Sequence, residues 1–133
     1  MTLSPALKHV LIIDDDPTLR EVLKSFYEDH GVEKISTAED GKKGLEILEV
    51  YGDTIDLIST DLNMPDIDGI EFMQRIQSLQ FKIPIIIVSS AHSTIIRSAE
   101  VLAKNYNVQL LGILEKPIKP HALETILAPY LDS

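Results

Sequence analysis

Five polar side chains stand directly after short apolar runs, where they could act together. They are Asp14, Asp15, Asp61, Ser89 and Lys116. Carboxylates that are brought together repel one another and raise one another's pKa unless a cation lies among them. Carboxylate oxygens are hard ligands that suit Mg²⁺, and Mn²⁺ accepts similar ligands. The three aspartates therefore predict a magnesium site, in which Mn²⁺ could replace Mg²⁺.

Asp61 has the chemistry of a nucleophile beside such a cation. A carboxylate is already ionised at neutral pH and needs no partner base. Attack on a phosphoryl group would give an aspartyl phosphate. The metal, the ammonium group of Lys116 and the hydroxyl of Ser89 would then neutralise charge on the transferred oxygens. The residue types thus indicate phosphoryl transfer to Asp61.

Each of these residues taken alone has an ordinary structural explanation. An aspartate after a strand is more often a turn residue or a helix cap, and we assign that role to Asp16. Ser89 could also be a cap, and Lys116 could be a solvated loop lysine. Four of the five predicted strands, however, are followed by residues that suit one reaction. We therefore favour the interpretation that these residues form a single phosphoryl-transfer site.

Short apolar runs alternate with amphipathic segments along the whole chain. Strands are predicted over 10–13, 33–37, 55–60, 85–88 and 109–114. Helices are predicted from Pro17 to a stop at Gly31, and over 41–51, 70–79, 93–106 and 119–131. The strands at 10–13, 85–88 and 109–114 are apolar at successive positions, which indicates cover on both faces.

This alternation predicts an α/β fold. We expect a doubly wound, five-stranded parallel sheet with helices on both faces, a flavodoxin-like (βα)5 arrangement with strand order 2-1-3-4-5. Ligand sites in such sheets form beyond the carboxyl ends of the strands. The five polar residues fall at those ends.

The composition suits a single domain over residues 1–133, because 44% apolar content allows a sizeable core. The chain has no cysteine, no signal-peptide pattern and no apolar stretch near the roughly 20 residues that span a bilayer. We therefore expect a cytoplasmic protein without membrane contact. A formal charge of −9 argues against direct nucleic acid binding by this segment.

The motifs VLIIDDDPTLRE, DLISTDLNMPDIDGIEF, IPIIIVSSA and LEKPI resemble the receiver domains of bacterial two-component response regulators. The resemblance covers nearly the whole chain. It implies that Asp61 accepts a phosphoryl group from a sensor histidine kinase or a phosphotransfer protein. Asp14 and Asp15 then correspond to the metal-binding acid pair, and Lys116 to the lysine that stabilises the phosphoryl group.

The resemblance also implies a switch. In the family, phosphorylation pulls a hydroxyl, here Ser89, toward the phosphoryl group and biases an existing equilibrium. Ile113 occupies the second switch position, which is often aromatic, so the usual aromatic rotation is in question. Asn63 corresponds to the residue whose backbone carbonyl helps to hold the metal. Asn63 and Ala91 stand where the family tunes dephosphorylation.

The segments AEVLAKNY and LLGILEKPIKP resemble receivers attached to cyclic-di-GMP phosphodiesterase outputs of the EAL type. This likeness implies an output domain in cis, and we expect the chain to be a fragment of a longer protein. Any enzymatic activity would then lie in that output domain. A reading frame that ended at Ser133 would refute the fragment hypothesis.

A phosphatase of the haloacid-dehalogenase type is the main alternative. LIIDDDPT fits its pattern, with Asp14 as nucleophile and Asp16 as acid or base. That family needs a further acidic motif after the lysine, and only Glu124 and Asp132 follow it here. The segment DLNMPDIDG would also be unexplained.

A receiver-like module that only binds partners is the second alternative. It would be expected to have lost the acid pair, the acceptor or the lysine. All of them are present in this chain, so we expect competence for phosphorylation.

Overall fold

A five-stranded parallel sheet forms the centre of the computed structural model, which describes residues 2–3, 7–64, 66–90 and 93–132. Its strands are β2 (His9–Ile13), β3 (Lys34–Ala38), β4 (Leu57–Asp61), β5 (Ile85–Ser89) and β6 (Leu110–Glu115). Their spatial order is β3-β2-β4-β5-β6. Counted within this sheet, the order is 2-1-3-4-5, which confirms the prediction.

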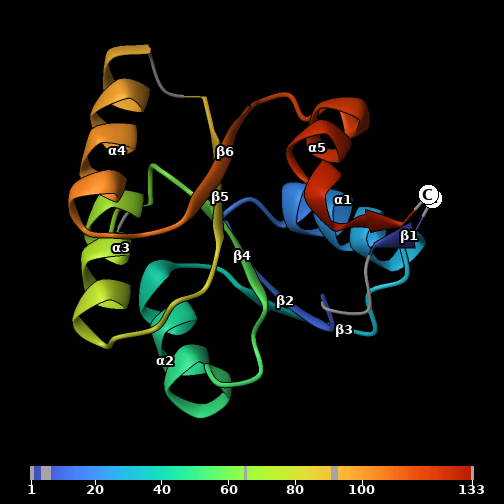
Figure 1. The fold of residues 1–133 in the computed structure, drawn as a ribbon, viewed down its shortest axis with the longest axis horizontal. Coiled ribbons are helices and arrows are strands. Elements are labelled where there is room, and N and C mark those ends of the chain that lie inside the picture. The colour runs from blue at the N-terminus through green and yellow to red at the C-terminus, as the bar shows by residue number, and fades with distance from the viewer. Residues whose placement is uncertain (1, 4–6, 65, 91–92, 133) are drawn as a thin grey trace.

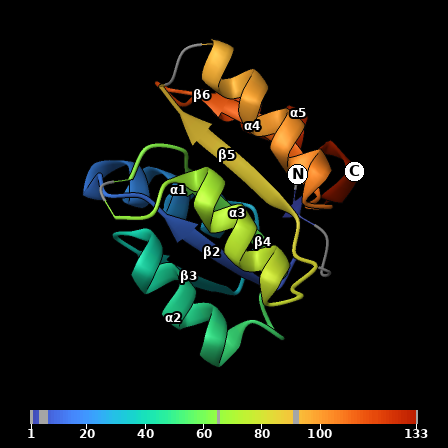
Figure 2. The same ribbon diagram turned by 90° about the vertical axis from the view of Figure 1, so that its left-hand side faces the viewer.

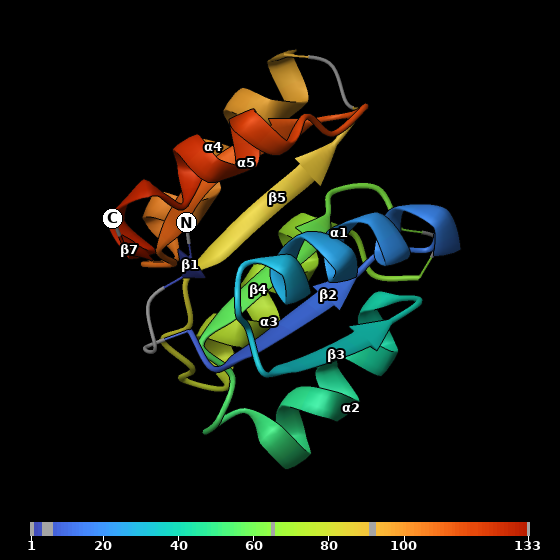
Figure 3. The ribbon, with the colours of Figure 1, turned by 90° about the vertical axis from the view of Figure 1, so that its right-hand side faces the viewer.

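Helices cover both faces of the sheet (Figure 1). They are α1 (Pro17–Asp29), α2 (Gly41–Tyr51), α3 (Gly69–Ser78), α4 (Ser93–Asn105) and α5 (Pro120–Ile126). Helices α2, α3 and α4 lie on one face (Figure 2), and α1 and α5 lie on the other (Figure 3). The predicted doubly wound arrangement is therefore confirmed.

Strand β2 supplies both layers of the core. Leu11 and Ile13 pack in the cluster on the α2–α3–α4 face, whereas Val10 and Ile12 pack in the cluster on the α1–α5 face. Successive side chains of a strand point to opposite faces, so an unbroken apolar run is what a strand covered on both sides requires. These two clusters pack on opposite faces of the sheet and hold in place the strands whose ends carry the polar residues.

The first two helices begin and end where local chemistry predicts. The Asp16 carboxylate accepts a hydrogen bond of 2.9 Å from the backbone N–H of Thr18, and Pro17 is the first helical residue of α1. Gly31, just after this helix, has a φ of 90°. The Asp40 carboxylate caps α2 in the same way, through the N–H of Lys43. The assignment of Asp16 to capping is confirmed.

Helix α5 is shorter than predicted. The expected helix reached residue 131, but α5 ends at Ile126 and a 3-10 turn follows over Ala128–Tyr130. Pro129 explains the difference, because proline has no backbone N–H and disfavours helical geometry at the residue before it.

The two ends of the described chain pair with each other. Strand β1 (Thr2–Leu3) and strand β7 (Leu131–Asp132) form an antiparallel ladder, which places the ends side by side (Figure 3). Strands of two residues carry no hydrophobic period, so no sequence pattern predicted them.

The prediction that much of 109–114 is covered on both faces holds, although the cover is incomplete. Leu110 and Ile113 pack against the cluster on the α2–α3–α4 face, and Leu111 and Leu114 pack in the cluster on the α1–α5 face. Residues 110–113 are only half-buried, because β6 is an edge strand with a neighbour on one side only. Within the described residues, no helix has the length and apolar character that crossing a membrane requires.

Candidate functional site

Three carboxylates meet at the carboxyl ends of β2 and β4. Asp14 and Asp15 follow β2, and Asp61 is the last residue of β4, the neighbouring strand. Each contributes an oxygen to a group whose members all lie within 4.8 Å of one another. Asp14 and Asp61 are buried and Asp15 is exposed. The fold thus brings together the three acids that the sequence singled out.

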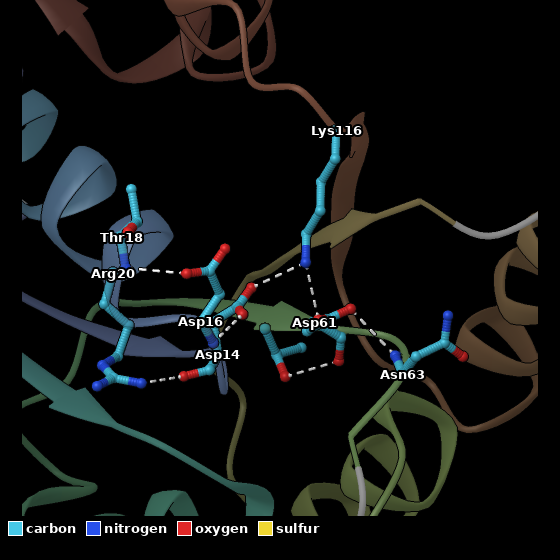
Figure 4. A network of polar contacts seen from close by, with 8 residues as sticks. Asp14, Asp16, Thr18, Arg20, Asp61, Asn63 and Lys116 are labelled. Carbon is cyan, nitrogen blue, oxygen red and sulfur yellow. Dashed lines mark hydrogen bonds and ion pairs between the residues drawn. The ribbon is translucent and has the colours of Figure 1, made fainter.

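Lys116 forms ion pairs with two of the three aspartates, Asp14 and Asp61 (Figure 4). Its Nζ atom donates a hydrogen bond of 2.9 Å to Oδ2 of Asp61. Burial by itself would lower the pKa of the ammonium group, but the hydrogen bond to Asp61 and the charges of Asp61 and Asp14 outweigh it. The pKa of Lys116 is therefore raised, and the side chain stays charged.

The Asp14 carboxylate is only partly satisfied. Its Oδ1 atom accepts a hydrogen bond of 2.9 Å from the N–H of Asp16. Its Oδ2 atom is buried and has no hydrogen-bond partner among the described residues, and the Lys116 ammonium lies 3.3 Å from it as an ion pair. Burial, followed by repulsion from Asp61, raises the pKa of Asp14. A buried carboxylate oxygen that accepts no hydrogen bond from the described residues and lies beside two more carboxylates fits a divalent cation.

The loop after Asp61 folds back tightly on the strand end. The N–H of Asn63 donates to Oδ1 of Asp61 at 3.0 Å, and the N–H of Gly69 donates to the carbonyl of Leu62 at 2.8 Å. A Cβ atom at position 69 would lie 2.9 Å from the carbonyl oxygen of Asp61. Glycine is therefore required there, and the loop holds Asn63 beside the acidic cluster.

Asp66 ties the same loop to α2. Its carboxylate accepts hydrogen bonds from the N–H of Lys42 at 2.9 Å and of Gly41 at 3.3 Å. Slight burial would raise the pKa of Asp66, but these backbone hydrogen bonds lower it overall. These hydrogen bonds could not be predicted from the sequence, because the partners of Asp66 lie more than 20 residues away in the chain.

The remaining predicted residues lie on β5, β6 and the loops beyond them. Ser89 is fully buried at the end of β5, and its carbonyl accepts a hydrogen bond of 3.0 Å from the N–H of Lys116. Ile113 pairs with Ile87 in the sheet and packs on the α2–α3–α4 side. Ala91 lies outside the described residues.

The family model for the response regulator receiver domain matches residues 10–128. The chain belongs to this family. Receiver domains are the phosphoacceptor modules of two-component response regulators and are signalling domains rather than catalytic ones. Chemotaxis protein CheY1 of Helicobacter pylori is 32% identical over 119 residues, covering 86% of this chain and 90% of that protein.

The chain is also similar to a solved structure of comparable length and to part of a longer protein. The crystal structure of chemotaxis protein CheY4 of Vibrio cholerae superposes with a TM-score of 0.78 at 26% identity, covering 94% of this chain and 99% of that one. A protein-glutamate methylesterase/protein-glutamine glutaminase of Rhodospirillum rubrum is 34% identical over 108 residues, which is 81% of this chain and 28% of that protein. The receiver domain spans about a quarter of the length of several curated relatives.

The family membership also bears on the phosphatase alternative. That alternative needs Asp16 as an acid or base, yet the Asp16 carboxylate is committed to capping α1. It also leaves Asp61 without a role, although Asp61 is the residue that Lys116 contacts most closely. The receiver interpretation accounts for both residues.

Proposed function

We propose that Asp61 accepts a phosphoryl group in a Mg²⁺-dependent reaction that operates the receiver domain as a switch. One observation carries the proposal. Asp61 is a buried carboxylate that shares its lysine with a second buried carboxylate, and an oxygen of the second accepts no hydrogen bond from the part of the chain that the structure describes. Such a cluster is costly unless a cation or a reaction uses it.

Asp14, Asp15 and Asp61 are the residues that would hold the metal, together with the backbone carbonyl of Asn63. All of these ligands are hard oxygens, which suits Mg²⁺ and also Mn²⁺. When bound, the cation would offset the negative charge of the cluster and of the incoming phosphoryl group. The exposure of Asp15 and the burial of the other two aspartates give the site one open side.

Asp61 would act as the nucleophile. One of its carboxylate oxygens forms a bond to phosphorus while the bond from phosphorus to the donor atom breaks, and the donor leaves with that electron pair. No proton has to be removed from Asp61, since a carboxylate is already ionised at neutral pH. The Lys116 ammonium, already 2.9 Å from Asp61, would stabilise the charge of the phosphoryl oxygens.

Ser89 and Ile113 are the residues through which we propose that phosphorylation acts on the rest of the domain. Ser89 is buried at the end of β5, next to β6, and Lys116 directly follows β6. Movement of the Ser89 hydroxyl toward a phosphoryl group would therefore change packing at the ends of β5 and β6. Ile113 is half-buried in β6 and offers no ring to rotate. Asn63 and Ala91 are proposed to set the lifetime of the phosphorylated state.

The phosphoryl donor would be a sensor histidine kinase or a phosphotransfer protein, as for receiver domains generally, and we expect this to occur in the cytoplasm. The output remains a prediction from sequence. The prediction of an EAL-type output is based on the segments AEVLAKNY and LLGILEKPIKP. The similar proteins include chemotaxis proteins and a methylesterase.

Intact mass after incubation with acetyl phosphate and Mg²⁺ tests the proposal. We expect the wild type to gain the mass of one phosphoryl group, and Asp61→Asn to gain none. Asp53→Asn is the matched control, because Asp53 is an exposed aspartate outside the acidic cluster. Labelling of Asp61→Asn would place the acceptor elsewhere. No labelling of the folded wild type with Mg²⁺ present would favour a module that only binds partners.

A further inference from the structure

Arg20 reaches from the first turns of α1 back to the end of β2. Its Nη1 atom donates a hydrogen bond of 2.7 Å to the backbone carbonyl oxygen of Asp14 (Figure 4). That carbonyl belongs to the planar peptide group that joins Asp14 to Asp15. A hydrogen bond that fixes this plane therefore limits the directions in which both acidic side chains can point.

The other polar atoms of Asp14 are also fixed, with one exception. Its N–H donates to the carbonyl of Ala38 at 3.1 Å, and its Oδ1 accepts from the N–H of Asp16 at 2.9 Å. The exception is Oδ2, which faces the Lys116 ammonium at 3.3 Å and has no hydrogen-bond partner within residues 7–64, 66–90 and 93–132. The backbone of Asp14 is thus held on both sides while one oxygen points into the cluster.

We propose that Arg20 is a positioning residue for the cation site, acting through the Asp14–Asp15 peptide. The inference rests on the proposed function, since it concerns the same cation. Ligands that are already oriented bind more tightly, because binding does not have to order them. Arginine suits this role, because its guanidinium group is charged at every ordinary pH and donates in a fixed planar geometry.

The charge of Arg20 by itself would have the opposite effect. A guanidinium group repels a divalent cation, so its removal would tighten Mg²⁺ binding if charge were its only influence. Loss of an orienting hydrogen bond weakens binding, typically by about 10–100-fold for partners that orient metal ligands. The direction of the change in affinity therefore separates the two roles.

Calorimetric titration of the phosphate-free protein with Mg²⁺ is the experiment. We expect Arg20→Met to weaken Mg²⁺ binding by about tenfold. Arg20→Lys should recover much of the affinity, because an ammonium group can still donate one hydrogen bond to the carbonyl. Lys24→Met is the matched control, since Lys24 lies one turn later on α1 and carries the same charge. It should bind Mg²⁺ nearly as the wild type does.

Backbone amide NMR shifts without metal give a second readout. Arg20→Met should shift the amide signals of Asp15 and Asp16, and Lys24→Met should leave them in place. Mg²⁺ binding by Arg20→Met that equals or exceeds that of the wild type would overturn the inference, as would Arg20→Lys behaving like Arg20→Met. If the wild type itself did not bind Mg²⁺, the proposed function would fail, which is a distinguishable result.

Discussion

Each end of the central sheet buries an ionisable side chain, but the two side chains differ in how fully they are hydrogen-bonded. At the amino end, His9 is 2% exposed, and both ring nitrogens are hydrogen-bonded, Nδ1 to Thr54 at 3.0 Å and Nε2 to Ser36 at 2.7 Å. At the carboxyl end, Asp14 is 1% exposed, and one of its two carboxylate oxygens accepts no hydrogen bond from any residue that the structure describes.

The hydrogen bonds of Thr54 identify the proton positions at the amino end. The Thr54 hydroxyl donates to the carbonyl of Tyr51 at 2.8 Å, so it must accept from Nδ1 of His9. Nε2 of the neutral ring then accepts from Ser36. Every polar atom of this ring is satisfied without a charge.

The contrast separates a buried group with a structural role, His9, from a buried group with a proposed functional role, Asp14. A buried polar group whose hydrogen bonds are all made contributes to stability and needs no ligand. A buried carboxylate beside other carboxylates costs stability when one of its oxygens accepts no hydrogen bond, even with an ammonium group close by. The protein places this carboxylate at the end of the sheet where receiver domains bind the phosphoryl group. Breaking each end separately should therefore affect different properties.

The largest effect is expected from Asp14→Asn. Removing a charged oxygen from the cluster should weaken Mg²⁺ binding by about a hundredfold or more, beyond the cost of losing an orienting partner. Without metal, the same change should raise the free energy of unfolding by about 1 kcal/mol, because it removes a poorly satisfied buried charge. Calorimetric titration and urea unfolding measure the two effects. A variant that was less stable than the wild type without metal would contradict this account of the cost.

The next effect is expected from His9→Ala at the opposite end. The substitution leaves the hydroxyls of Ser36 and Thr54 without their partner and opens space in a buried position. We expect the free energy of unfolding to fall by about 2–3 kcal/mol. Labelling by acetyl phosphate should be unchanged in the folded protein. Loss of labelling in folded His9→Ala would show that the two ends are coupled.

The smallest effect is expected from pH. Burial, followed by the charge of Lys34, lowers the pKa of His9 more than Asp56 raises it. The unfolded chain therefore binds this proton more readily, and the contribution of His9 to stability is lost as pH falls below about 6.5. Urea unfolding between about pH 7.5 and about pH 5.5 should show a shallower loss for His9→Gln than for the wild type.

A variant of His121, an exposed histidine on α5, is the control for this titration. His121→Gln should lose stability with pH as steeply as the wild type. Equal slopes for His9→Gln and the wild type would mean that His9 keeps its ordinary pKa in the folded protein.

Several elements could be predicted because their signals are local. Helix α2 has its bounds where the Asp40 cap and Gly52 place them, and α1 begins at Pro17 after the Asp16 cap. The hydrogen bonds of His9 could not be predicted, because its partners lie 27 and 45 residues away in the chain. The Arg20 contact was missed because a side chain that bonds to a backbone carbonyl leaves no pattern in the sequence.

The order of apolar and polar residues was enough to predict the alternation of strands and helices, and with it the edge of the sheet at which Asp14, Asp61 and Lys116 meet. Parallel strands place all their carboxyl ends at one edge, so the rule needs only the order of elements. Two facts became known only from the three-dimensional arrangement: which oxygen of Asp14 accepts no hydrogen bond from the described residues, and how closely Lys116 approaches Asp61, 55 residues away. Those facts depend on register, packing and side-chain direction, which join segments that the sequence keeps apart.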